Sequence, residues 1–305
     1  MIDDSQQQEI FGWHHRREVF ASSYLKTLFS GVILSTTVIS PHKTGLTSFF
    51  LNDLLPHAVD EGHCVIYVDL SDTSFPATAA FLIGLEKAMH GNSRNLGVSF
   101  NFFKGLFSPS KPNKNNSYLS KGALSIVDQA YFDENFDEHI EIFDTKIKKI
   151  AEKSPVLIIV DHAQNLRLNK IGVKFANYFK DLLICNRFAI KPIYGMQTLD
   201  AWANVFKDPK FPLYSEGASV HTLPPLDRAF VRTVMNKVGA TVHLDEAMHC
   251  FSMVKNQPGI FIAIIIAWDD KSGKSLSSHF VSALEDKTLK EEFVRTVANI
   301  KAISI

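Results

Sequence analysis

One short segment of the sequence has the residue types and spacing of a phosphate-binding loop. It reads SPHKTGLTS at residues 40–48 and follows a β-branched run at 32–39. In loops of the pattern G-x-x-x-x-G-K-S/T, backbone N–H groups surround phosphates, the lysine offsets their charge and the hydroxyl holds Mg²⁺. The segment therefore predicts nucleotide contacts from Pro41, His42, Lys43, Thr44, Gly45, Leu46, Thr47 and Ser48.

The loop departs from that pattern at two positions. Ser40 stands at the first glycine, and Leu46 stands where the lysine should be. Lys43 lies in the same loop and could swing inward to supply the charge. A plain strand–turn–helix junction without any ligand explains the segment equally well, so both interpretations remain open.

A second candidate for chemistry is the apolar run VLIIV at 156–160 that ends in Asp161. A buried strand ending in aspartate is typical of a Walker B motif, in which the carboxylate holds the water shell of Mg²⁺. Thr47 and Asp161 are therefore the predicted metal ligands. The next position normally carries a glutamate base, but here it is His162. An imidazole could act as a base near neutral pH, or His162 is an ordinary solvated or packed histidine.

The elements that must position these residues follow an α/β pattern. Apolar runs that predict strands alternate with amphipathic stretches that predict helices, which implies a parallel sheet covered on both faces. The strands are expected at 32–39, 64–70, 155–161, 189–195 and 218–223, and the helices at 16–29, 47–58, 76–90 and 166–186. Beyond residues 224–225 only helical patterns recur, at 227–238, 244–254, 259–268, 276–286 and 289–302.

We therefore expect two domains. Residues 1–224 should form the α/β domain, with a mobile insert at about 101–123, and residues 225–305 a helical domain. The insert is rich in Lys, Asn, Ser and Pro and shows no periodicity, which is typical of a loop.

Three motifs in order resemble a known family. PHKTGL at 41–46, IYVDL at 66–70 and DHAQ at 161–164 are similar to bacterial P-loop ATPases of the AAA+ superfamily, in the branch of origin-recognition and archaeal-type ATPases. The resemblance runs from about Arg17 to Trp268. It implies a helical lid after the P-loop domain, ATP or ADP with Mg²⁺ as ligands, and a polar sensor at Gln197 or Thr198, of which Gln197 is our candidate catalytic residue.

The same resemblance implies arginines that this chain lacks. None lies near the predicted lid turn at 256–259, and none occurs from Met196 to Val220, where Lys207 and Lys210 are the only cations. An arginine finger can contribute about 10³–10⁵ in rate. Together with Leu46 and His162, these absences predict a degenerate ATPase that binds nucleotide weakly or not at all. Such a protein would act as a regulatory or scaffold subunit, through protein partners or as a homo-oligomer.

Two alternative functions remain. The chain could be an active ATPase that uses Lys43 and His162, or a DNA-associated regulator of a replication or mobile-element system. Basic residues between Lys104 and Lys121 support the second alternative. The balance of 32 basic and 32 acidic residues counts against it, since strong nucleic-acid binding usually needs a surplus of Lys and Arg.

Length and composition limit the class of protein. A chain of 305 residues that is 46% hydrophobic can bury a large core. Its 3 cysteines form no CxxC pair, so a disulfide framework is not expected. The acidic, polar start is unlike a secretory signal, and the longest apolar run, at 260–268, is too short to span a membrane. We expect a cytoplasmic protein.

Overall fold

The computed structural model describes residues 15–41, 44–73, 76–89, 134–217, 219–268 and 275–285. His42, Lys43, the predicted insert at 101–123 and the predicted helix at 289–302 lie outside the described residues. The chain forms two compact units. One consists of the described parts of 1–20, 40–54 and 222–305, and the other of the described parts of 21–39 and 55–221.

The sheet has five strands in the order β2-β3-β4-β1-β5. β2, β3, β4 and β1 pair in parallel, and β3 and β4 are buried along their whole length. This is the predicted α/β fold with a parallel sheet. The strands are β1 (Thr36–Ile39), β2 (Cys64–Asp69), β3 (Val156–Asp161), β4 (Ile190–Met196) and β5 (Ser219–Thr222).

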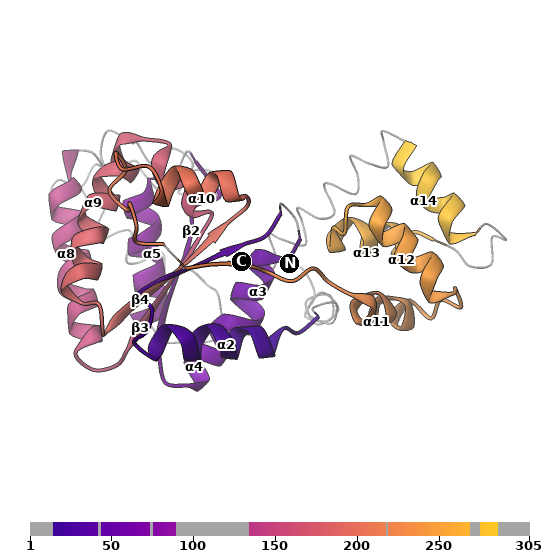
Figure 1. The fold of residues 1–305 in the computed structure, drawn as a ribbon, viewed down its shortest axis with the longest axis horizontal. Helices are drawn as coiled ribbons and strands as arrows, with labels where there is room; N and C mark the ends of the chain where they lie inside the picture. The colour runs from indigo at the N-terminus through magenta and orange to yellow at the C-terminus, as the bar shows by residue number, and fades with distance from the viewer. Residues whose placement is uncertain are drawn as a thin grey trace, which may run out of the picture. The chain divides into compact units, whose positions relative to one another are not determined.

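Helices pack on both faces of this sheet, with α5, α8 and α9 on one side and α2 on the other (Figure 1). Their apolar faces build a core in which four phenylalanine rings contact one another, namely Phe81, Phe143, Phe175 and Phe179. The helices of this part are α2 (Glu18–Phe29), α4 (Leu55–Asp60), α5 (Ala77–Met89), α8 (Phe136–Ala151), α9 (Lys170–Cys185) and α10 (Leu199–Phe206).

Several boundaries differ from the sequence prediction. β1 begins only at Thr36, because Val32 and Leu34 are exposed and gain nothing from pairing in the sheet. The predicted helix at 166–186 is divided into a 3₁₀ segment, η3 (Ala163–Arg167), and α9. Asn169 causes the break, since its side chain accepts a 2.7 Å hydrogen bond from Gly172 N and caps α9. Helix α10 was not predicted.

The helical stretch after the loop begins one residue earlier than expected. It consists of α3 (Leu46–Phe49), a π-helical turn η1 (Phe50–Leu54) and α4. The π turn inserts an irregularity into the helix, which periodicity at 47–58 could not indicate.

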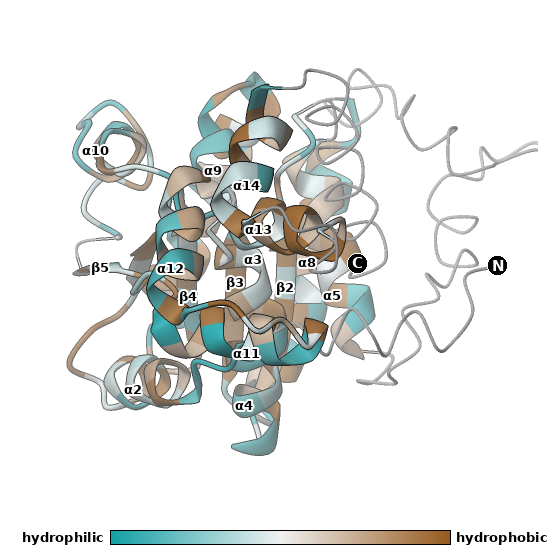
Figure 2. Ribbon diagram, turned by 90° about the vertical axis from the view of Figure 1, so that its right-hand side faces the viewer, coloured by the Kyte–Doolittle hydropathy of each residue, from teal (hydrophilic) through white to brown (hydrophobic). Residues whose placement is uncertain are grey.

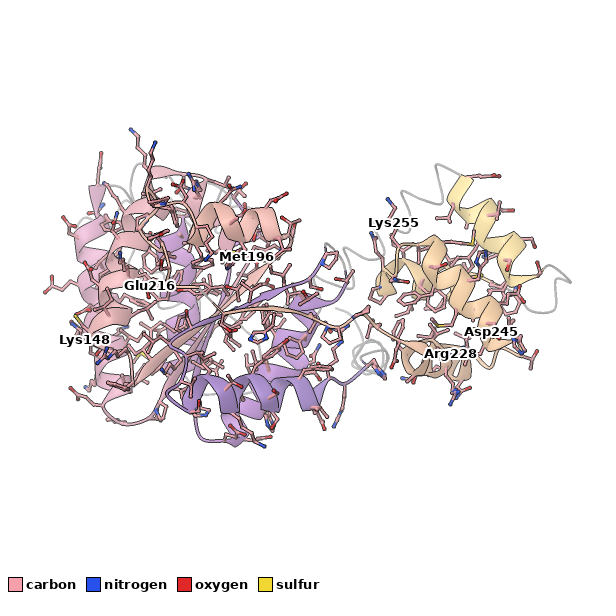
Figure 3. All side chains as sticks on the ribbon, in the orientation of Figure 1. Lys148, Met196, Glu216, Arg228, Asp245 and Lys255 are labelled. Carbon is pink, nitrogen blue, oxygen red and sulfur yellow. The ribbon has the colours of Figure 1, made fainter. Side chains whose placement is uncertain are left out.

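In the described residues, four helices follow the sheet and share their own core. They are α11 (Arg228–Val238), α12 (Leu244–Met253), α13 (Pro258–Ile266) and α14 (Leu276–Glu285). α13 is apolar around its circumference and packs against the other three (Figure 2). Arg228 and Asp245 form a 2.6 Å ion pair between α11 and α12 (Figure 3). The expected domain boundary near Pro225 remains a prediction. None of the helices in the described ranges is long and apolar enough to cross a membrane.

Candidate functional site

The carboxyl ends of three strands carry the residues singled out by sequence. β1 ends at Ile39 and continues directly into the loop, whereas β2 ends at Asp69 and β3 at Asp161. Asp69 and Asp161 are register partners on adjacent strands. In parallel α/β sheets, ligands bind outside the carboxyl ends of the strands, so this edge is the expected place for a site. The loop and the acidic pair belong to different compact units.

The loop keeps a backbone suited to phosphate. Gly45 caps α3 in the left-handed region, with φ +94° and ψ +27°, a conformation that glycine adopts without steric cost. The loop is closed on itself, because Thr44 Oγ1 lies 2.5 Å from both Ser40 Oγ and Pro41 O. Thr44 N also donates to Pro41 O at 3.2 Å. Such a closed turn leading into a helix can present N–H groups to an anion.

The three side chains that follow Gly45 differ in burial. Leu46, at the position where the pattern has lysine, is 9% exposed. Thr47 and Ser48 are half-buried, and Ser48 Oγ accepts a 3.1 Å hydrogen bond from Asn52. Position 46 therefore contributes a buried apolar side chain and no positive charge toward a ligand.

A residue that the sequence analysis missed lies against this loop. Arg17 is 8% exposed, and its Nη2 lies 3.4 Å from Thr44 O. A Cβ atom added to Gly45 would lie 3.8 Å from the same Nη2. Arg17 precedes Thr44 by 27 residues, and no local pattern connects the two positions. The sequence shows only that Arg17 follows another arginine, Arg16, and gives no sign of its contact with the loop.

The acidic pair forms a small preorganised cluster with His162. Asp161 is 1% exposed, and it accepts hydrogen bonds from Tyr67 Oη at 3.1 Å and from His162 N at 2.9 Å. His162 has φ +57°, in the left-handed region. Its Nδ1 lies 3.2 Å from Asp69 Oδ1 and 3.5 Å from Asp161 Oδ1.

The protonation states in this cluster follow from its contacts. Burial raises the pKa of Asp69, but hydrogen bonds from His162 and Ser71 outweigh burial and hold that pKa below its usual value. Burial, with the charges of Asp161 and Asp69, raises the pKa of Tyr67 well above its usual value. The phenol of Tyr67 therefore keeps its proton and acts as a donor to Asp161.

This donor set fits a divalent cation. One oxygen each from Asp69 and Asp161 and one nitrogen of His162 lie within 4.8 Å of one another. Carboxylate oxygens suit Mg²⁺, and an imidazole nitrogen extends the range to metals such as Mn²⁺ and Zn²⁺. Of the two predicted metal ligands, Asp161 is in this cluster. Asp69, which the sequence analysis did not name, stands beside it because the two strands end in register.

The end of β4 carries the predicted sensor. Gln197 is half-buried and directly follows Met196, which is labelled in Figure 3. Thr198, the alternative, uses its hydroxyl to cap α10, accepting a 3.0 Å hydrogen bond from Ala201 N. Gln197 therefore stays the predicted sensor.

Known structures share this fold at low sequence identity. A Walker-type ATPase of Pyrococcus abyssi aligns over 92% of this chain and 74% of its own, with 15% identity and a TM-score of 0.53. The Orc1 protein of Aeropyrum pernix, solved in complex with DNA, aligns over 88% of this chain and 64% of its own, with 15% identity and a TM-score of 0.50. No protein-family model and no curated protein matches the sequence. The chain therefore has the fold of an AAA+ P-loop ATPase, a parallel-sheet domain followed by helices.

Proposed function

We propose that this protein binds ATP or ADP weakly with Mg²⁺, hydrolyses ATP slowly or not at all, and acts as a regulatory or scaffold subunit through protein partners. The AAA+ P-loop fold supplies the basis for nucleotide binding. The proposal includes the division into an α/β domain at 1–224 and a helical lid at 225–305.

The observation that carries the proposal is the contrast at positions 45 and 46. Gly45 keeps the left-handed backbone that a phosphate loop requires, whereas Leu46 is buried and apolar. The backbone contribution to phosphate binding is retained, but the lysine that would approach the β- and γ-phosphates is missing. Loss of that charge lowers affinity and removes stabilisation of the transferring phosphoryl group.

In this proposal the loop backbone orients the phosphates, and Asp161 with Thr47 holds Mg²⁺. When bound, the metal neutralises charge on the phosphate oxygens. Tyr67 keeps Asp161 oriented through its 3.1 Å hydrogen bond. The hydroxyl of Thr47 is half-buried at the start of α3. Nucleotide binding without turnover can still shift the balance between two conformations, which is sufficient for a regulatory role.

Slow hydrolysis is expected because the position after Asp161 carries His162 and not the glutamate that normally orients the attacking water. Lys207 and Lys210 are the two cations in the stretch where an arginine finger would lie. The Nζ atom of Lys207 lies over the ring of Trp202, 5.2 Å from the ring centroid. An ammonium also lacks the planar fork of arginine.

The test is equilibrium binding of ATP and ADP to the full chain, with and without Mg²⁺, followed by phosphate release. We expect the binding of ATP and ADP to depend on Mg²⁺. The rate of phosphate release by the wild-type chain should equal the rate of the Asp161→Asn variant. Leu46→Lys should tighten ATP binding by about 10- to 100-fold, since a charge-assisted hydrogen bond contributes about 1.5–3 kcal/mol. If neither the wild-type chain nor the Leu46→Lys variant binds ATP or ADP, the proposed nucleotide binding is contradicted.

The active-ATPase alternative rests on a specific observation. Asp69 orients His162 in the manner of a carboxylate that positions a catalytic imidazole. In that case phosphate release would be measurable and would disappear in Asp161→Asn and in His162→Ala. Lys43, the other residue of this alternative, lies outside the described residues.

A further inference from the structure

We propose that Arg17 supplies the positive charge at the phosphate loop, in place of the lysine missing at position 46. This inference rests on the proposed nucleotide binding, and it adds a residue that the loop pattern itself does not contain. It specifies the ligand chemistry as a di- or triphosphate, because the charge would act on the phosphates and not on the base or sugar.

The position of Arg17 is the first support. Its guanidinium lies at the turn between Thr44 and Gly45, 3.4 Å from Thr44 O. It also faces Gly45 on the side where a Cβ would stand, since an added Cβ would be 3.8 Å from Nη2 and 4.0 Å from Nη1. A phosphate approaching the glycine backbone would therefore meet this guanidinium, which comes from a segment distant in sequence.

Burial of the charge is the second support. Arg17 is 8% exposed, so its guanidinium is held against the loop and away from solvent. A guanidinium is permanently charged and presents five N–H donors in a rigid plane that matches phosphate oxygens. The Nη2 of Arg17 donates a 3.4 Å hydrogen bond to Thr44 O, which holds the guanidinium beside the loop.

The neighbouring arginine provides an internal contrast. The side chain of Arg16 is 77% exposed and forms a 2.7 Å ion pair with Glu18. Two adjacent residues of the same type thus have different environments, one in solvent and one buried against the loop. Arg16→Gln is therefore a matched control for Arg17→Gln, since both remove one charge from the same short segment.

The experiment measures binding of ATP, ADP and adenosine to the full chain by titration calorimetry. We expect Arg17→Gln to weaken ATP and ADP binding by about 10- to 100-fold and to leave adenosine binding unchanged. Arg16→Gln should bind all three ligands as the wild-type chain does. Arg17→Lys, which keeps the charge but loses the planar fork, should lose less than Arg17→Gln.

A charge rescue completes the test. In the double variant with Arg17→Gln and Leu46→Lys, ATP affinity should return to that of wild type or exceed it. The inference is overturned if Arg17→Gln and Arg16→Gln bind ATP equally, or if Arg17→Gln weakens adenosine as much as ATP, because a structural role would affect both ligands. If Arg17→Gln does not fold, Arg17→Met, which also removes the charge, takes its place, and equal binding of ATP by Arg17→Met and Arg16→Gln would overturn the inference. Absence of ATP binding by the wild-type chain would contradict the proposed function itself.

Discussion

At position 46 a leucine is buried where the loop pattern has lysine, while the preceding glycine keeps its left-handed backbone. The two facts are compatible because backbone geometry and side-chain charge are set by different residues. Arg17 adds a third component, a cation that reaches the loop from outside it. At the scale of single residues, Gly45 therefore sets the backbone of the loop, whereas a buried positive charge, that of Arg17, comes from outside it.

The left-handed backbone at Gly45 leads to a prediction at this scale. Gly45→Ala places a Cβ where φ is +94°, which costs about 1–2 kcal/mol for a residue other than glycine. We expect a lower free energy of unfolding in urea and weaker ATP binding. Gly31→Ala, with φ +82° and open space around the added Cβ, should lower stability similarly but leave ATP affinity unchanged. Equal affinities of both variants for ATP would show that the Gly45 backbone plays no part in binding.

The sequence singles out His162 as a candidate, but it does not indicate that His162 contacts Asp69. Asp69 ends β2 within the IYVDL motif at 66–70, but that motif did not assign it a role as a ligand or as a partner of His162. Its contact with His162 arises because β2 and β3 are adjacent and in register. Residue types alone could not show that pairing, since strand order is a property of the whole sheet.

At the scale of elements, periodicity predicted helices and strands well where an apolar face is buried continuously. It failed where a polar side chain or an exposed residue decides the boundary. Asn169 begins α9 within a stretch that has helical spacing throughout, and α10 is short, with only Val205 and Phe206 of its residues buried. Local capping and tertiary contacts outweigh propensity in these places.

The packing of α5 on β2 gives a prediction for an element. In an isolated helix Gly84→Ala would be favourable by about 1 kcal/mol. Here a Cβ at position 84 would lie 2.5 Å from Tyr67 O, so α5 must move away from β2. We expect a net loss of about 1–3 kcal/mol, measured by urea unfolding, together with weaker metal binding, since Tyr67 orients Asp161. Unchanged or raised stability would mean that the helix moves at no cost.

At the scale of the whole molecule, two clusters of buried apolar residues can be distinguished in the described part of the chain. One lies around the sheet and includes Phe179, and the other lies among α11–α14 and includes Phe251. Trp202 packs against the first core and Trp268 against the second. Each core therefore has its own fluorescent reporter.

These reporters give a prediction about cooperativity. Phe251→Ala should cost about 3–5 kcal/mol and lower the unfolding midpoint reported by Trp268 more than that reported by Trp202. Phe179→Ala should do the reverse. The measurement uses chains that keep one of these two tryptophans, with Trp13 replaced by phenylalanine. If both reporters shift together in both variants, the two cores unfold as one cooperative system.

The sequence by itself determined the α/β class, the helical region after the sheet, the turn between β1 and α3 and the strand ending in Asp161. These features are local, because they depend on periodicity and on motifs within a few residues. Only the tertiary structure brought Arg17 to Thr44 and Asp69 to His162. Those contacts join residues 27 and 93 positions apart, and they depend on strand order and chain path, which no local pattern encodes.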